Sequence, residues 1–166
     1  MFSSLNDLLI RPLTRADKGL LPEALYQALY VSPQEIPLSR DLLSLPEFAR
    51  YIERWGERRG DLGSVAILKN RHVIGVVWLR LFPRDTPGYG FVDEHTPELL
   101  ISVHPEWRGC GIGTKLLEVT LQQARGHFPA VSLSVTPGNP AQHLYERLGF
   151  TVVRTCINDI TMRSML

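Results

Sequence analysis

Three glycines at alternate positions stand between an apolar run and an amphipathic run, and this spacing suits an anionic ligand. Gly109, Gly111 and Gly113 precede a segment with helical periodicity, and the apolar run 99–103 comes before them. The first backbone N–H groups of a helix have no partners within the helix and carry partial positive charge. Glycine has no Cβ atom, so the backbone can approach a ligand closely. The pattern predicts a strand, a loop that binds phosphate or pyrophosphate, and a helix.

Two common phosphate-binding motifs fit this loop poorly. A Walker loop has Gly-Lys-Ser/Thr after four intervening residues, but Thr114 stands five residues after Gly109 and the lysine follows it. A dinucleotide-binding fingerprint needs a third glycine where Thr114 stands, and an acid after the next strand. That strand, predicted at 131–135, is followed by Thr-Pro. The loop therefore favours a different phosphate ligand.

The segment 108–113, Arg-Gly-Cys-Gly-Ile-Gly, resembles the acyl-CoA-binding motif Arg/Gln-x-x-Gly-x-Gly/Ala of the GNAT superfamily of N-acetyltransferases. A second segment, 139–150, is close to the family pattern Asn-x-x-Ala-x-x-Leu-Tyr-x-x-x-Gly-Phe. The two motifs occur in the expected order and are separated by one helix and one strand. The resemblance extends over residues 8–166, with clear motifs only between 99 and 150.

The resemblance implies a site for acetyl-CoA as co-substrate. Backbone N–H groups of the glycine loop would bind the pyrophosphate, which assigns to CoA binding Arg108, Gly109, Cys110, Gly111, Ile112, Gly113 and Thr114. In the family the preceding strand pairs with the pantetheine arm, which assigns Ile101, Ser102 and Val103. The N–H near Val103 would then donate to the thioester oxygen. We expect Cys110 to contribute its backbone rather than a reactive thiol, because the sequence shows no neighbouring base.

Tyr145 matches the tyrosine that acts as general acid in the family. Its phenol would protonate the departing thiolate, and Tyr145 is also assigned to CoA binding. Packing alone would also explain an aromatic residue here, because Ala141 and Leu144 share its helical face. Asn139 is assigned to CoA binding as well, although the role of helix N-cap, with Gln142 completing a capping box, would account for it.

Glu98, at the start of the strand before the glycine loop, is our candidate for the general base. An amine acceptor must lose a proton, so a carboxylate or a water chain has to accept it. In the branch resembling ribosomal-protein acetyltransferases a glutamate often lies on the strand after the central helix, where this chain has Ser134. That departure counts against that branch. Asp93, Glu94 and His95 are rival bases in the adjacent loop. For each of the candidates, including Glu98, the alternative is a solvated surface residue without a catalytic role.

Periodicity and turn residues predict the elements that would position these groups. In chain order we expect a strand at 8–14, helices around 21–29 and at 46–59, strands at 64–69 and 72–82, a strand at 99–103, a helix at 113–124, a strand at 131–135, a helix at 140–148, and strands at 151–157 and 160–165. Residues 83–97 contain too many breakers for regular structure, and a loop of that length is usually functional or disordered. In the second helix we expect Phe48, Ile52 and Trp55 to face inward.

This order predicts one α/β domain over residues 1–166, with a mixed sheet of about seven strands and about four helices. The GNAT resemblance implies that the sheet is splayed at its centre. The gap would open between the strands at 99–103 and 131–135, and the acyl-CoA arm would lie in it.

Composition and charge exclude several other classes of protein. The chain has 18 basic and 17 acidic residues among 166, which gives no excess charge for nucleic acid or an anionic membrane surface. Its two cysteines make no disulfide framework, so we expect a reducing cytoplasm. The histidines and cysteines show no metal-ligand spacing. No signal peptide is apparent, and the apolar run 73–79 is far shorter than a membrane span.

These observations predict an N-acetyltransferase that moves acetyl from acetyl-CoA to a primary amine by direct attack in a ternary complex. The acceptor, a small molecule or a peptide, would enter between the first two helices and the loop 89–95. The contrasting hypothesis is a non-catalytic acyl-CoA-binding or sensing module, which would bind acetyl-CoA without turnover. A nucleotide-binding domain, the least favoured alternative, would let ATP or NAD compete with CoA. The sequence leaves open whether the chain forms a homodimer.

Overall fold

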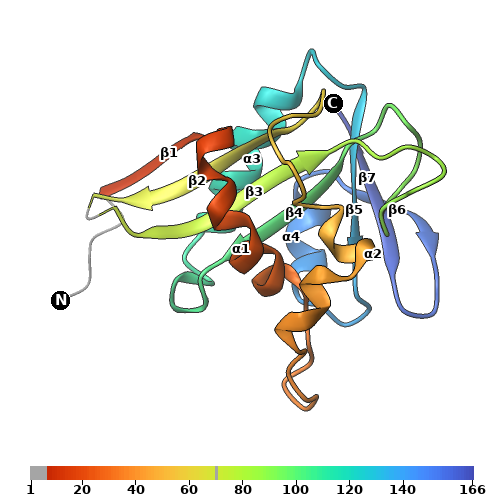
Figure 1. Ribbon diagram of the computed structural model, residues 1–166, viewed down its shortest axis with the longest axis horizontal. Coiled ribbons are helices and arrows are strands. Elements are labelled where there is room, and N and C mark those ends of the chain that lie inside the picture. The colour runs from red at the N-terminus through yellow and green to blue at the C-terminus, as the bar shows by residue number, and fades with distance from the viewer. Residues whose placement is uncertain (1–6, 70) are drawn as a thin grey trace.

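The computed structural model describes residues 7–69 and 71–166, and these form a seven-stranded mixed sheet with helices on both faces (Figure 1). The strands, in the spatial order β1-β2-β3-β4-β5-β7-β6, are β1 Leu8–Pro12, β2 Leu62–Leu68, β3 Val73–Arg80, β4 Glu98–Val103, β5 Ala130–Val135, β6 Thr151–Thr155 and β7 Ile160–Met165. The helices are α1 Leu21–Ala28, α2 Pro46–Ala49, α3 Ile112–Ala124 and α4 Ala141–Arg147, with short 3₁₀ helices at Arg15–Leu20, Arg40–Ser44 and Pro105–Trp107. The predicted fold class is confirmed.

Strands β4 and β5 form the parallel pair at the centre of the sheet, and they diverge almost at once (Figure 1). Their only register pair is Glu98 with Ser132, whereas β4 pairs antiparallel with β3 along its whole length. The adjoining bond runs from the Ser132 N–H to the Pro97 carbonyl at 3.0 Å. The sheet is therefore splayed at its centre, as expected, and most of β4 has an unpaired backbone edge.

Each face of the sheet has its own hydrophobic cluster. On one face α3 and α4 pack over the sheet, and α3 buries a stripe of Leu116, Leu117, Thr120, Leu121 and Ala124. On the other face α1 contributes Leu21, Ala24 and Leu25, which are buried. Fully burying one such leucine contributes about 2 kcal/mol. The two layers hold the central strands between them.

The helix predicted at 46–59 is wrong beyond its first turn, because α2 ends at Ala49 and irregular turns follow. The buried Arg80 of β3 explains the change. Its Nη1 donates to the carbonyl oxygens of Arg50 at 3.0 Å and Glu53 at 2.6 Å, which a continuing helix would need as its own acceptors. Arg54 also takes a left-handed φ of 50°. A cation on a neighbouring strand thus interrupts a favourable helical pattern.

The inward face expected for this segment is nevertheless present. Trp55 is buried, and Phe48 and Ile52 are half-buried against the same cluster. The Arg54–Glu57 ion pair that the spacing suggests forms at 2.8 Å. Arg50 instead donates to the Pro87 carbonyl, at 2.7 Å, and so reaches the long loop.

The remaining differences lie at element ends. The hairpin of β6 and β7 forms, but its loop spans four residues, 156–159, and is closed by a bond from Cys156 N to Asp159 O at 2.8 Å. Residues 83–97 have no helix or strand, as predicted. Asn70, which we placed in the turn between β2 and β3, and residues 1–6, where we saw no signal peptide, lie outside the described residues.

Two predicted absences can be examined over the described part of the chain. Across residues 7–69 and 71–166 no helix has both the length and the apolar content to cross a membrane. Within the same ranges no three His, Cys, Asp or Glu side chains gather as a metal site.

Removing one partner of the buried pair of Arg80 and Asp61 should be strongly destabilising. Their side chains are 0% and 1% exposed, with Nη2 to Oδ2 at 2.9 Å and Nε to Oδ1 at 3.0 Å. Asp61→Asn leaves a buried cation without its counterion, so we expect the free energy of unfolding in urea to fall by about 3–5 kcal/mol. Glu57→Gln, which removes exposed ion pairs, should cost less than about 1 kcal/mol. Equal costs for the two variants would contradict this assignment.

Candidate active site

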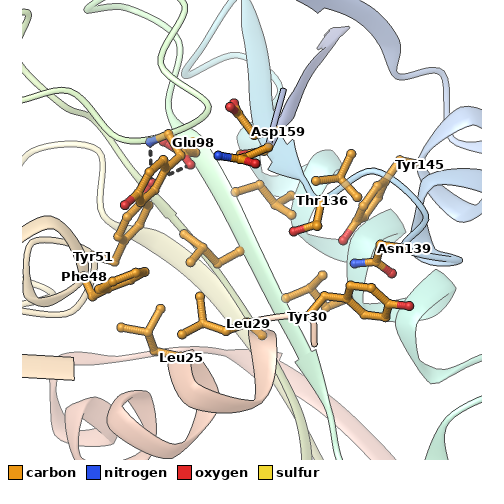
Figure 2. A pocket seen from close by; sticks show the side chains of 18 of the residues that line it. Leu25, Leu29, Tyr30, Phe48, Tyr51, Glu98, Thr136, Asn139, Tyr145 and Asp159 are labelled. Atoms are coloured by element: carbon orange, nitrogen blue, oxygen red, sulfur yellow. Dashed lines mark hydrogen bonds between the residues drawn. The ribbon is translucent and has the colours of Figure 1, made fainter. Parts of the chain in front are cut away.

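A cavity of about 280 Å³ connects the gap beside β4 with the inner surfaces of α1 and α2 (Figure 2). Asn139 and Tyr145 lie at one end, Leu25 and Phe48 lie toward the other, and Glu98 lies on the wall of β4. Both predicted catalytic side chains, from β4 and α4, therefore line one space. The full lining is Leu25, Ala28, Leu29, Tyr30, Leu38, Phe48, Tyr51, Tyr89, Glu98, Leu99, Leu100, Ile101, Ser134, Val135, Thr136, Asn139, Tyr145, Asn158 and Asp159.

The backbone groups of β4 alternate between β3 and the gap. The His104 N–H donates to the Ile74 carbonyl at 2.8 Å, and this bond continues the β3–β4 register. Because antiparallel pairs alternate, the residues two and four positions before His104 also bond to β3. Ile101 and Val103 therefore direct their N–H and C=O groups to the side that β5 has left. The backbone of Ser102, which we had assigned to CoA binding, faces β3 instead.

The loop before α3 is open on its outer side. Gly109 and Gly111 have φ of 73° and 80°, and a Cβ atom at either would meet nothing within 4 Å. A side chain at either position would therefore begin in open space. Arg108 ties the loop to β4, since its Nε donates to the Val103 carbonyl at 3.0 Å. Cys110 is exposed, with its Sγ 3.7 Å from the Arg108 carbonyl.

The first turn of α3 follows the loop, and α3 is long enough, at 13 residues, to polarise its N-terminus. Ile112 and Thr114 lie in this turn, where N–H groups have no carbonyl partner within the helix. Gly113 lies in the same turn but faces inward. A Cβ on it would lie 3.4 Å from the Leu144 side chain and 3.7 Å from that of Ile101, which are ordinary packing distances, so this position faces α4 and β4.

Tyr145 is 7% exposed, and it presents what exposure it has to the cavity. Its ring packs edge-on against Phe150 with centroids 6.0 Å apart. No described residue accepts a hydrogen bond from its hydroxyl. Burial raises the pKa of this phenol to about 12, so the group is protonated at neutral pH. The ring of Tyr145 thus packs in the core while its hydroxyl keeps a proton that it can donate.

Asn139 lies two positions before the first residue of α4 and lines the cavity close to Tyr145 (Figure 2). Its Oδ1 accepts a hydrogen bond from the Ala141 N–H at 3.0 Å, which is the capping role that we expected. The predicted capping box is wrong, because the Gln142 side chain donates to Glu146 at 3.0 Å rather than returning to Asn139. The amide is therefore held in place at the edge of the cavity.

Glu98 is buried, and only one of its two carboxylate oxygens has a hydrogen-bond partner among the described residues. Oε1 accepts a hydrogen bond from the Tyr51 hydroxyl at 2.8 Å, and that hydroxyl accepts one from the Tyr89 N–H at 2.7 Å. Oε2 has no partner among the described residues. Burial raises the pKa of Glu98 to about 7. A Cβ at residue 88 would lie 2.0 Å from Oε2, so Gly88 is required for this close packing.

The rival bases do not line the cavity. Asp93 Oδ1 accepts from the His95 N–H at 2.8 Å, and Glu94 accepts from the Arg84 N–H at 3.2 Å. Both interactions are local to the exposed loop. Of the four candidates only Glu98 contributes to the lining.

Tyr51 and Asp159 are among the lining residues that the sequence does not assign to the site. Tyr51 lies three positions after Phe48, so helical spacing marks it as buried, but nothing marks its bond to a carboxylate 47 positions away. Asp159, in the turn between β6 and β7, reaches the cavity only because that hairpin folds beside β5.

The comparisons with known proteins agree with this architecture. A family model described as Acetyltransferase (GNAT) family matches residues 24–150. A search of curated proteins finds no significant match. The solved structure of a GCN5-related N-acetyltransferase from Kribbella flavida superposes with a TM-score of 0.67 and 22% identity, covering 98% of this chain and 100% of that one.

Two further solved structures have the same fold. That of the yncA protein from Salmonella typhimurium with acetyl-CoA gives a TM-score of 0.66 at 23% identity, covering 96% of this chain and 94% of that one. The structure of a spermidine N-acetyltransferase variant from Vibrio cholerae gives a TM-score of 0.62 at 21% identity, covering 96% of this chain and 94% of that one. At such identities the likeness shows the fold alone.

The raised pKa of Glu98 predicts a pH-dependent stability. Because the folded state raises this pKa from 4.5 to about 7, it favours the protonated acid, and stability is lost as the pH rises through this window. Glu98→Gln removes the titration. We compare the free energies of unfolding of the variant and the parent protein in urea. The value for the variant minus that for the parent should rise by up to about 3 kcal/mol from pH 4.5 to pH 8. A difference that does not change with pH would contradict the shift.

Proposed function

The chain belongs to the GNAT family of acetyltransferases, and we propose from this premise that it transfers acetyl from acetyl-CoA to a primary amine by direct attack in a ternary complex. Acetyl-CoA is the co-substrate. The observation that carries the proposal is that Glu98 and Tyr145 line one cavity where β4 separates from β5. A base and an acid on the same space are what the two proton movements of this reaction need.

The chain has groups suited to each part of acetyl-CoA, which supplies the thioester. The open backbone at Gly109 and Gly111 and the first turn of α3 would hold the pyrophosphate. The unpaired edge of β4 at Ile101 and Val103 would pair with the amide-bearing arm. Because Arg108 occupies the Val103 carbonyl, only the N–H of Val103 is left to pair with that arm.

Glu98 would take the proton that the amine loses. Its Oε2 is unpartnered, and with a pKa of about 7 a large share of the carboxylate is ionised at neutral pH. As the new N–C bond forms and the C–S bond breaks, the Tyr145 hydroxyl would donate its proton to the departing sulfur. The amine would enter between α1, α2 and Tyr89, which wall the opposite end of the cavity.

Removing the hydroxyl of Tyr145 tests its role as the general acid. Tyr145→Phe keeps the packing against Phe150 but has no proton to donate, so we expect kcat to fall about 10²–10⁴-fold with an unchanged calorimetric Kd for acetyl-CoA. Tyr26→Phe is the matched control, because the Tyr26 hydroxyl bonds to the Leu38 carbonyl and Tyr26 does not line the cavity. A Tyr145→Phe enzyme within threefold of the parent would leave Tyr145 a packing residue only.

Two glycines at opposite ends of α3 test the phosphate loop. Gly111 and Gly126 have φ of 80° and 84°, and a Cβ at either would meet nothing within 4 Å. Replacement by alanine therefore imposes a similar backbone strain at both. Only Gly111→Ala puts a methyl group where the pyrophosphate would lie, so we expect its Kd for acetyl-CoA to rise about tenfold, while Gly126→Ala stays near the parent value. Equal Kd values would count against the loop.

The whole proposal is tested by measuring acetyl-CoA turnover over a panel of amines. CoA release with at least one primary amine, lost in Tyr145→Phe, is the expected result. Binding of acetyl-CoA without turnover of any amine would instead favour a non-catalytic acyl-CoA-binding module.

A further inference from the structure

One wall of the cavity is apolar. Leu29 just after α1, Leu38 in the following loop and Phe48 of α2 contribute to it. Tyr89, from the loop 83–97, lies against Phe48 with ring centroids 5.9 Å apart and the planes tilted by 36°. These four side chains come from separate segments, and all four line the cavity.

The ionisable groups of the cavity are acidic and lie on one side. Among the described residues that line it, Glu98 and Asp159 are the charged ones, and none is lysine, arginine or histidine. In Figure 2 both carboxylates lie across the cavity from Leu25 and Leu29. An ammonium group is thus favoured on one side only, and the facing wall has no carboxylate for a second one.

We propose that the acceptor is a monoamine with a compact apolar substituent, of the size of a phenyl or branched alkyl group. The inference rests on the proposed function and specifies its acceptor class. The amine nitrogen would lie at Glu98, with Asp159 nearby, and the substituent would lie on Leu29, Leu38 and Phe48. Burying apolar surface there favours binding, whereas a second ammonium against this wall would lose its hydration without gaining a partner.

The test compares kcat/KM for phenethylamine, ethylamine, putrescine and a lysine-containing tripeptide. Phenethylamine should exceed ethylamine by at least tenfold, because each apolar group that enters such a pocket raises kcat/KM about tenfold or more. Putrescine and the tripeptide should fall below phenethylamine. Preference for putrescine would overturn the inference in favour of a polycation, and preference for the tripeptide in favour of a protein acceptor.

Two leucines provide a matched pair of variants. Leu38 and Leu45 are 40% and 44% exposed and lie outside the strands and α-helices, but only Leu38 lines the cavity. Leu38→Asp places a carboxylate on the apolar wall, so it should lower kcat/KM for phenethylamine about tenfold and raise that for putrescine. Leu45→Asp should change neither. The same response in both variants would contradict the assignment of the wall.

A binding measurement separates this inference from the proposed function. If no amine is acetylated, the proposed acetyl transfer fails, and calorimetry of phenethylamine and putrescine with the CoA-saturated protein then decides the acceptor class. Tighter binding of phenethylamine, weakened by Leu38→Asp, supports the apolar wall. Equal or tighter binding of putrescine overturns it.

Discussion

The site depends on the early separation of two neighbouring parallel strands. A strand inside a sheet satisfies its N–H and C=O groups on both sides, but β4 does so on the β5 side only at Glu98 and Ser132. Beyond that pair its inner edge faces a cavity, while both faces of the sheet stay covered by apolar layers. The packing therefore keeps the gap open, and an extended amide-bearing ligand can complete the sheet.

The two predicted catalytic groups gain their properties from burial beside this gap. Burial raises the pKa of the carboxyl of Glu98 to about 7, against the opposing effect of nearby Arg154, and that of the phenol of Tyr145 to about 12. The first change brings a carboxylate close to neutral pH, where it can accept a proton, and the second keeps a phenol as a donor. One apolar environment thus prepares both a base and an acid.

Features with local causes could be predicted from the sequence, and features with distant causes could not. The glycine loop, α3 and the start of α4 are set by contiguous residues, and the motifs in them indicate the splayed fold through a family resemblance. The irregular segment after Ala49 depends on Arg80, about 30 positions away, whose guanidinium takes the carbonyls a helix would use. The hydrogen bond between Tyr51 and Glu98 and the position of Asp159 on the cavity likewise depend on the folded sheet.

Arg80 also explains why Glu98 is free to act. The two residues are direct register partners on β3 and β4, so their side chains leave the same face of the sheet, where opposite charges normally pair. Here Asp61 engages the guanidinium at 2.9 and 3.0 Å, and Nη1 donates to the backbone carbonyls of Arg50 and Glu53. The Trp78 indole N–H donates to the Tyr51 carbonyl of that segment at 3.0 Å, so the tyrosine hydroxyl reaches Glu98 in place of a cation. A neutral donor steadies the carboxylate without the large fall in pKa that an arginine would cause, which leaves it basic enough to accept a proton.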